Sequence, residues 1–481
     1  MKISDNHIYD AMRDVNTQSF WFAQALQQEM PFTPVSLAKD TRADVCIVGG
    51  GYTGLWTAVQ LKQQKPELDI VVIDKGLCGA GASGRNGGCM LTWSGKYFTL
   101  LATYGAAEAS RLVTASEQAL FHIRDFCRDH RIEAEVRVDG VLNTATNTAQ
   151  LGALDTVIAA LQEQQINQWH KWDVDEVQRA AGSRQHIEGY FSSVGGSLQP
   201  GLLVRGLRRV ALKMGVRIYE NTALTRLDEN QPALIQTPNG TITAKKVVLA
   251  LNAWMPSMFP AFQRNIMLVS SDMAITEQAG EQLDRAGLVD GKAVIDSRAF
   301  VHYYRRTPDG RLMLGKGGNM ISFNNVVGPK FDQPSQYAGQ LREAINRFFP
   351  DLSKKEISTT WTGPSDRSTT GLPFFGALNS NPDIVYGLGY SGNGVGQSYV
   401  GGQFLSAMVL EQDNEWTRST MAKGPLGSFP PEPVRWLGAM MVKNAIRRKE
   451  RMEDAGRKSW WVDRQLAKIA ATTAGRLKSV R

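Results

Sequence analysis

The chain has 481 residues, of which 42% are hydrophobic and 21% are charged, as is ordinary for a globular protein with two or three domain-sized cores. Its formal net charge is +8, but residues 442–481 hold 12 Lys or Arg against 4 Asp or Glu, so the rest of the chain is formally neutral. The charge therefore excludes a protein that is basic throughout and indicates a basic C-terminal tail.

The N-terminal segment gives no sign of export. Its first ten residues, MKISDNHIYD, contain acids and lack the apolar core of a signal peptide, which predicts a cytoplasmic protein. Residues 1–42 are expected to form an arm in which the aromatic residues Phe20 to Phe22 pack on the body. The four cysteines form no C-x-x-C pair and the histidines lack metal-ligand spacing, so we expect neither a structural disulfide nor a metal centre.

The first strong motif follows this arm. An apolar run, Val45 to Val48, predicts a buried parallel strand that leads into Gly49, Gly51 and Gly54 at the G-x-G-x-x-G spacing. The first glycine permits a tight turn, the second lets a pyrophosphate approach the backbone, and the third lets the next helix pack closely on the strand. We expect that helix, residues 55–65, to direct its N-terminal N–H groups at the phosphates.

A second strand makes this motif more specific. Ile70 to Ile73 is an apolar run that ends in Asp74, 20 residues beyond Gly54, where a carboxylate suits a ribose hydroxyl pair. The pattern predicts dinucleotide binding, and the alternative is an ordinary glycine-rich turn between strand and helix.

Small residues dominate the segment from Gly76 to Gly88. A packed helix or strand would not use so many glycines, so we expect the backbone here to lie against a flat ligand. Ser83 and Arg85 would supply polar contacts to its phosphates or ring edge. A flexible linker is the alternative, although linkers rarely carry Arg and Asn among the glycines.

The middle of the chain alternates between helical and strand patterns. Helices are predicted at 106–130, over most of 150–189, and at 202–214, with strands at 136–144, 216–220, 223–227 and 247–251. Asn239-Gly240 predicts a hairpin turn before the last of these strands. Because that strand returns to the first sheet after an excursion, we expect a discontinuous nucleotide-binding domain.

The next region predicts a second sheet. Within residues 256–365, Val301 to Arg306 and Leu312 to Leu314 form a hairpin across Thr307 to Gly310, and an amphipathic helix spans 337–349. An unusual loop is expected from Trp361 to Gly376. A strand at 384–388 then leads into the glycines of 389–396, which open a helix to Leu410 and aim a second helix N-terminus at the ligand.

In this order, the segments GGGYTG, Asp74, GAGASGRNGG, VVLALNAW and GYSGNGVG resemble the D-amino acid oxidase and sarcosine oxidase superfamily of FAD enzymes. The resemblance covers residues 40–410 and is nearest the bacterial branch that contains gamma-glutamylputrescine oxidase. It implies an α/β protein, α+β overall, with a discontinuous Rossmann-like FAD domain of the glutathione-reductase type, an antiparallel-sheet substrate domain and a helical basic C-terminal tail. The implied boundaries are 1–42 for the arm, 43–98, 198–255 and 366–412 for the FAD domain, 99–197 and 256–365 for the substrate domain, and 413–481 for the C-terminal extension.

The resemblance also implies which residues hold the cofactor. The expected FAD contacts are Gly49, Gly51, Tyr52, Thr53, Gly54, Asp74, Lys75, Ala82, Ser83, Arg85, Asn86, Gly87, Gly88, Leu224, Asn252, Trp254, Gly363, Gly392, Asn393, Gly394, Val395 and Gly396. Asp74 stands where the family usually has Glu, and Leu224 where it usually has Val. Non-covalent FAD is expected, because the C-terminal half has no cysteine and no histidine lies near the first glycine-rich loop.

The chemistry that the resemblance implies is oxidation of a C–H bond beside an amine nitrogen. Hydride would pass to flavin N5, the imine would hydrolyse, and O2 would be reduced to H2O2. The candidate catalytic residues are Tyr303, Tyr304, Arg305, Arg367 and Lys316. Since neighbouring side chains on a strand point to opposite faces, at most one of the two tyrosines should face the pocket. Arg305 or Arg306 is expected to pair with a substrate anion, or to be a solvated surface charge.

The sequence does not identify the electron acceptor. The lysine that sarcosine oxidases use for O2 corresponds to Met313, and Lys316, which is the candidate substitute, should point to the opposite face. One alternative is therefore a dehydrogenase that passes electrons to a membrane quinone, peripheral to the inner membrane face, through the basic tail and Trp460-Trp461. A third hypothesis is a nucleic-acid-binding flavoprotein. It depends only on the charge of the tail, because the sequence shows no motif that is known to recognise nucleic acid. The oligomeric state is not indicated.

Overall fold

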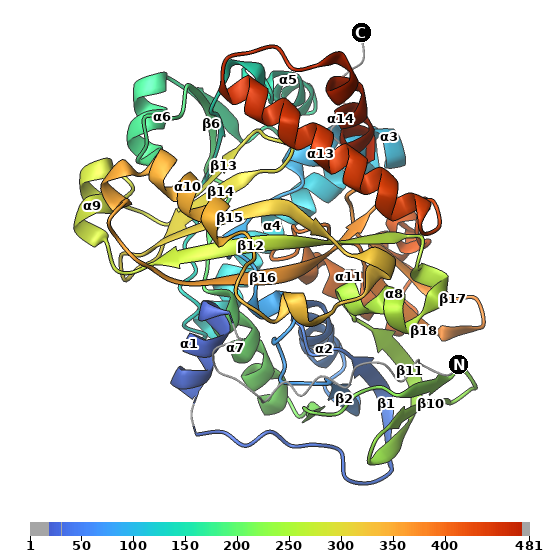
Figure 1. Ribbon diagram of the computed structural model, residues 1–481. Helices are drawn as coiled ribbons and strands as arrows, with labels where there is room; N and C mark the ends of the chain where they lie inside the picture. The colour runs from blue at the N-terminus through green and yellow to red at the C-terminus, as the bar shows by residue number, and fades with distance from the viewer. Residues whose placement is uncertain (1–18, 30, 474–481) are drawn as a thin grey trace.

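The first sheet is built around the strand at residues 41–48, in which Val45 to Val48 are buried on both faces of the sheet. In the computed structural model (Figure 1), which describes residues 19–29 and 31–473, the strand order is β17-β18-β11-β1-β2-β8, and β9 and β10 extend it beside β11. The members are β1 (Thr41–Val48), β2 (Ile70–Ile73), β8 (Arg217–Tyr219), β9 (Arg226–Asp228), β10 (Ala233–Thr237), β11 (Gly240–Leu249), β17 (Phe374–Leu378) and β18 (Asn381–Leu388). The strands β18, β11, β1, β2 and β8 run parallel, as buried apolar runs favour.

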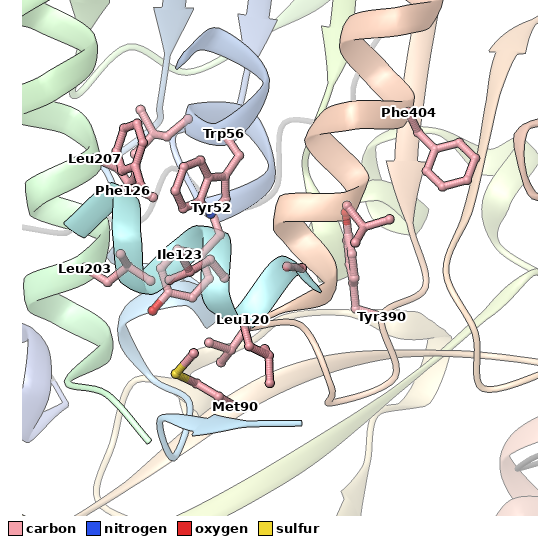
Figure 2. Packing of buried hydrophobic residues seen from close by; sticks show 14 of the residues in the cluster. Tyr52, Trp56, Met90, Leu120, Ile123, Phe126, Leu203, Leu207, Tyr390 and Phe404 are labelled. Atoms are coloured by element: carbon pink, nitrogen blue, oxygen red, sulfur yellow. The ribbon is translucent and has the colours of Figure 1, made fainter. Parts of the chain in front are cut away.

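Four helices form a layer beside this sheet; two of them contact its strands directly, and the other two pack on those helices. They are α2 (Tyr52–Gln64), α4 (Ala106–Asp129), α7 (Pro200–Lys213) and α11 (Gln397–Val409). Figure 2 shows their shared core, in which Trp56, Phe126 and Phe404 are buried with Leu120 and Leu203. Helix α2 follows β1 in the chain and α11 follows β18, so the N-termini of both helices lie near the carboxyl ends of these parallel strands. The helix predicted at 106–130 is confirmed, but it packs on this nucleotide-binding layer.

The second sheet is largely antiparallel and lies across the middle of the molecule in Figure 1. Its strand order is β16-β12-β15-β14-β13-β4-β6-β5, with a parallel pairing only between β13 and β4. The members are β4 (Val141–Ala145), β5 (Trp169–Trp172), β6 (Glu188–Ser192), β12 (Ile266–Thr276), β13 (Ala293–Asp296), β14 (His302–Arg306), β15 (Leu312–Ile321) and β16 (Ile357–Ser368). The predicted hairpin at Thr307 to Gly310 joins β14 to β15. The α/β class with a second antiparallel sheet is confirmed.

Shorter elements connect the two sheets. They include α1 (Phe20–Glu29), α3 (Tyr97–Tyr104), α5 (Asp155–Glu163), α6 (Val174–Ala181), α8 (Met255–Met258), α9 (Gly280–Ala286), α10 (Ala338–Phe348) and α12 (Glu415–Arg418), with β3 (Cys89–Met90) paired to β7 (Gly196–Ser197). A 3₁₀ turn, Ala82–Gly84, interrupts the glycine-rich segment after β2. The part of the predicted arm before Ser19 lies outside the described residues.

Three secondary-structure predictions were wrong in part. The stretch 150–189 contains β5 and the start of β6 as well as helices. The strand predicted from 136 begins only at Val141, and the segment expected to be a loop from Trp361 instead continues β16 to Ser368. The Gly363-Pro364 pair in β16 gives no alternating apolar and polar pattern, but pairing along all of β12 holds these residues extended.

The C-terminal extension packs on the second sheet. It contains α13 (Val434–Asp454) and α14 (Trp461–Thr473), and α13 lies against β15 (Figure 1). Several of its basic residues point inward: Lys443 and Arg447 donate to the carbonyl oxygen of Asn319, and Arg448 pairs with Asp463 at 2.7 Å. Part of the positive charge of the predicted basic helical tail is therefore used in contacts within the protein. Within residues 19–29 and 31–473, no helix is both long and apolar enough to cross a membrane.

Candidate cofactor and active site

The glycine turn after β1 requires residues without a side chain. Gly49 has a φ of +113°, and a Cβ atom there would lie 2.5 Å from the carbonyl oxygen of Ala250. A Cβ atom at Gly54 would overlap the carbonyl oxygen of Gly49. The chain can therefore turn sharply from strand to helix only with glycine at these positions, as the motif predicted.

The N-terminus of α2 is left open toward a ligand. Its N-cap residue, Gly51, has no side chain to cap the helix, and the Ser83 hydroxyl accepts from the Tyr52 N–H at 2.9 Å. The Tyr52 and Thr53 side chains instead point into the core, where their hydroxyls bond the Pro200 carbonyl and Tyr390. The first turn of α2, with Ser83 beside it, therefore offers N–H groups and a positive dipole end that suit a phosphate.

Asp74 lies at the end of β2, beside this turn. Its carboxylate accepts from the N–H groups of Gly50 at 2.8 Å and Gly76 at 2.9 Å, which fixes its orientation. A carboxylate has further acceptor positions, so these two bonds leave capacity for a hydroxyl pair. The neighbouring Lys75 ammonium lies 4.7 Å from the centre of the Trp254 ring.

Two other predicted contacts lie in the same region. Leu224 is buried in the core under the first sheet, and Asn252 begins a short turn with a φ of +46°. A Cβ atom at Gly81 would lie 3.2 Å from the Trp254 ring, so the glycine-rich segment after Asp74 passes directly over this tryptophan.

Residues 79–88, here called the flavin loop, are held by their own side chains. The Asn86 amide donates to the carbonyl oxygens of Ala82 and Ser83, and its oxygen accepts from the Gly88 N–H at 2.8 Å. Arg85 has contacts that the sequence does not indicate, because its guanidinium pairs with Asp332 at 2.6 Å and donates to the Ala80 and Phe331 carbonyls. Its guanidinium thus has partners within the protein, and its contact with the cofactor stays a prediction.

The second glycine loop, Gly389 to Gly396, ends at the N-terminus of α11. Gly396 is its N-cap residue and provides no side-chain cap, and Gly392 adopts a φ of +84°. Gly394 and Asn393 make only backbone bonds, and Val395 is buried. This loop therefore presents a second uncapped helix N-terminus, as predicted from the glycine spacing.

Asp366 organises this loop and was not predicted from the sequence. It is buried, and its carboxylate accepts from the N–H groups of Gly389 at 2.5 Å and Ser391 at 3.3 Å. Burial raises the pKa of Asp366 to about 6 despite these bonds. An isolated aspartate at the end of a strand carries no sequence signal for this role, because its partners lie more than 20 residues away.

One face of the second sheet meets the flavin loop. A Cβ atom at Gly87 would lie 2.5 Å from the Tyr303 ring and 3.1 Å from Met313. Tyr303, Met273, Met313 and Trp361 form one apolar cluster, in which the Tyr303 hydroxyl bonds the Ser271 hydroxyl at 2.9 Å. Gly363 lies on β16 opposite Ser271. Met273 and Ser271 were missed because the sequence did not show which face of β12 would point here.

The alternate residues on β14 and β15 point to the opposite face, which α10 and α13 cover. The Tyr304 hydroxyl is buried there, bonded to the Ala181 carbonyl and His186, both at 2.7 Å. Lys316 donates to the Phe300 carbonyl at 3.3 Å and lies 3.2 Å from His302. The prediction that only one tyrosine faces the pocket, and that Lys316 points away from Met313, agrees with this placement. Tyr304 and Lys316 therefore lie on the face away from the flavin loop, and this placement gives no support to their predicted catalytic roles.

The remaining arginines also differ from the prediction. Arg305 is fully buried and donates to the carbonyl oxygens of Gly87 and Leu198, both at 2.8 Å, so it is not a solvated charge. Arg306 pairs with Asp284 at the edge of the sheet. Arg367 lies on β16 rather than in a loop, and its backbone bridges Tyr390.

The donor set fits FAD. Two uncapped helix N-termini, Asp74 at the end of β2 and a glycine-rich loop between them are the groups that an extended flavin dinucleotide requires for its pyrophosphate, ribose and ring. The apolar wall around Tyr303 would then adjoin the ring, because it contacts the flavin loop at Gly87.

Comparisons with known proteins identify the family and the fold. The chain is 29% identical to gamma-glutamylputrescine oxidoreductase from Escherichia coli over 401 residues, covering 81% of this chain and 88% of that protein. Among solved structures, L-proline dehydrogenase from P. horikoshii aligns with a TM-score of 0.65 at 17% identity, over 78% of this chain and 96% of that chain. Glycine oxidase from Geobacillus kaustophilus aligns with a TM-score of 0.63 at 18% identity, over 78% and 96%. A family model described as FAD dependent oxidoreductase (DAO) matches residues 44–408, and the chain therefore belongs to this family of FAD-dependent oxidoreductases.

Proposed function

We propose that this protein oxidises the C–N bond of an amine or amino acid-like substrate bound against the face of the second sheet that carries Tyr303. The observation that carries this proposal is the composition of that face. It is a wall of Met273, Met313 and Trp361 that contains one hydroxyl pair, Tyr303 with Ser271, and it adjoins the flavin loop at Gly87.

This wall suits a reaction that depends on positioning. FAD, when bound, supplies the hydride acceptor for the C–H bond beside the nitrogen. Apolar side chains exclude water and favour the neutral amine, and no strong acid or base is required. Burial also raises the pKa of Tyr303, so its hydroxyl stays protonated and orients the substrate through a hydrogen bond. The imine product would hydrolyse in water to an aldehyde or keto acid.

The similar proteins indicate only a broad class of substrate. The similar Escherichia coli protein is named for a gamma-glutamylated diamine, and solved neighbours are named for glycine and L-proline. We propose a small amine from this range, with O2 reduced to H2O2. Non-covalent FAD, release of H2O2 and cytoplasmic location are parts of the same proposal.

A panel experiment tests it. The purified yellow protein would be mixed without oxygen with gamma-glutamylputrescine, putrescine, glycine, sarcosine and L-proline, and bleaching of the flavin absorbance would be followed. We expect at least one amine to bleach the flavin and, after admission of air, to yield peroxide. If dithionite bleaches the flavin and every amine fails, amine oxidation is wrong.

Exposed side chains of the C-terminal extension favour a second candidate, a dehydrogenase that delivers electrons at a membrane surface. Trp460 is 75% exposed, Trp461 64% and Met441 60%, beside exposed basic residues of α13 and α14. Aromatic and basic groups of this kind suit an anionic lipid interface.

The two candidates differ in what the tail does. Turnover with O2 and with an artificial quinone would be measured for the wild type and for a Trp460→Ser/Trp461→Ser variant, with and without vesicles containing anionic lipid. Vesicle-dependent quinone reduction that the variant loses would support the dehydrogenase. Peroxide formation that neither the vesicles nor the variant changes would support the oxidase.

A further inference from the structure

Helix α1 lies outside residues 44–408, the stretch that matches the family model, yet it packs directly on the flavin loop. The Ser19 hydroxyl, just before α1, donates to the carbonyl oxygen of Gly84. The Phe22 ring is so close that a Cβ atom at Gly84 would lie 2.8 Å from it, and one at Gly79 would lie 3.2 Å from it. The flavin loop is therefore supported by Ser19 and Phe22 at Gly84, the last residue of its 3₁₀ turn, and by Phe22 at Gly79, three residues before that turn.

Trp21 of the same helix contacts the flavin loop through Arg305. The guanidinium carbon of Arg305 lies 4.6 Å from the centre of the Trp21 ring, and both side chains are 1% exposed. On its other side, Arg305 donates to the carbonyl oxygens of Gly87 and Leu198. The arginine is thus held between an aromatic ring and two main-chain carbonyls, one of which belongs to the flavin loop.

Among residues 19–29 and 31–473, no carboxylate forms an ion pair with Arg305, although the Glu135 carboxylate is near enough to attract its charge. Other buried arginines have such partners: Arg205 pairs with Glu29 and Glu220, and Arg298 pairs with Asp296 and Asp454. An unpaired buried charge is costly, so such sites are retained where a ligand supplies the opposite charge. Burial lowers the pKa of Arg305 to about 10, which still leaves it protonated at neutral pH.

We propose that Arg305, clamped by Trp21, is a positioning residue that fixes the flavin loop and also holds a positive charge there that favours the reduced, anionic cofactor over the oxidised one. The inference rests on the proposed function only in assuming that FAD binds and is reduced. It assigns to the N-terminal helix a part in cofactor binding that the family match does not include.

Binding of oxidised and of dithionite-reduced FAD to the full chain tests this proposal without any amine. The variants are Arg305→Met, which removes the charge and both hydrogen bonds, Arg305→Lys, which keeps only the charge, and Trp21→Ala, which removes the stack. Arg311→Met is the matched control, because Arg311 stacks on Phe20 of the same helix at 5.4 Å but bonds Asp309 and the Thr276 carbonyl instead of the flavin loop.

For Arg305→Met we expect the Kd of oxidised FAD to rise about tenfold and that of reduced FAD about a hundredfold. The extra factor of about ten corresponds to a fall of about 30 mV in the potential of the two-electron couple. Arg305→Lys should weaken both forms about equally, because it keeps the charge but loses the two-carbonyl fork. Trp21→Ala should weaken both forms about fivefold, and Arg311→Met should change neither by more than about twofold.

Other results would overturn the proposal. An unchanged ratio of the two Kd values in Arg305→Met would mean that the charge does not act on the cofactor, and equal losses in Arg311→Met would mean that any α1 contact has the same effect. Thermal unfolding of each variant without FAD detects a general loss of folding. If Arg305→Met does not fold, Arg305→Lys and Trp21→Ala decide, since a wild-type Kd in both would refute the clamp. Failure of the wild type to bind FAD would instead refute the proposed function.

Discussion

Two sets of buried charges in the second sheet are compensated in different ways. On the face covered by α13, Asp296 accepts from Arg298 at 2.9 Å and from the His302 ring at 3.0 Å, and the second carboxylate on Arg298 comes from Asp454 of α13. On the face that carries Tyr303, Arg305 donates to two carbonyl oxygens, and Asp366, at the end of β16 beside the second glycine loop, accepts from N–H groups. The Asp296 cluster compensates charge with charge, whereas main-chain dipoles compensate Arg305 and Asp366.

The difference separates structural from functional charge. Nearby cations hold the pKa of Asp296 well below its usual range, whereas burial raises the pKa of Asp366. A paired carboxylate stabilises its ionised form and the fold together. A carboxylate or guanidinium that only dipoles compensate is left able to respond to a bound ligand.

The largest effect should come from breaking the Asp296 cluster. Asp296→Ala removes the acceptor for Arg298 and His302 in a site that is 2% exposed, so we expect unfolding in urea to show a loss of about 3–5 kcal/mol. The FAD affinity of the folded protein should not change. A loss below about 1 kcal/mol would mean that these ion pairs are as dispensable as surface pairs.

A pH-dependent effect should come from Asp366. Its ordinary pKa is 3.8 and its folded pKa is about 6, so the folded state binds more protons between these values, and stability falls as the pH rises through this window. At pH 7 the cost amounts to about 3 kcal/mol relative to pH values below 4. Urea unfolding between pH 4 and pH 7 should show this fall in the wild type and not in Asp366→Asn. Identical slopes for the two proteins would contradict the assignment.

The smallest effect should separate the two adjacent tyrosines. Tyr304→Phe removes hydrogen bonds to His186 and the Ala181 carbonyl, which should lower stability by about 1–2 kcal/mol and leave kcat/KM unchanged. Tyr303→Phe removes the hydroxyl paired with Ser271, which should lower kcat/KM about tenfold with little change in stability. The test is to measure kcat/KM by steady-state kinetics and stability by thermal unfolding for both variants. The reverse pattern would place the substrate on the α13 face.

Local signals carried the prediction of the first sheet. The boundaries of β2 were correct because Ile70 to Ile73 is apolar and flanked by polar residues, and the glycine turn was correct because only glycine tolerates the backbone at Gly49. The alternation of β14 also predicted that a single tyrosine would face the site. Each of these features is determined by residues that are close together in the sequence.

The rest depends on partners that are distant in the sequence. Nothing in the sequence near Arg85 indicates Asp332, and nothing near Arg305 indicates Trp21, so the sequence alone predicts ligands as the partners of both arginines. Strand β16 was missed because its residues 363–366, Gly-Pro-Ser-Asp, are typical of turns, and only pairing with β12 keeps them extended. Tertiary contacts therefore override the local secondary-structure preference in the second sheet more than at the glycine turn of the first sheet.

The order of the strands in the first sheet has a consequence for synthesis. Strand β11 pairs with β1, which is about 200 residues earlier, and with β18, which is about 140 residues later. The second glycine loop follows β18 directly. A chain emerging from the ribosome therefore cannot complete its cofactor site until Gly396, about 350 residues after the end of β1, has been made, and β11 must wait without its partner β18 during the later part of that interval. Shortage of the cofactor or of chaperones should for this reason reduce the yield of folded protein before it affects turnover.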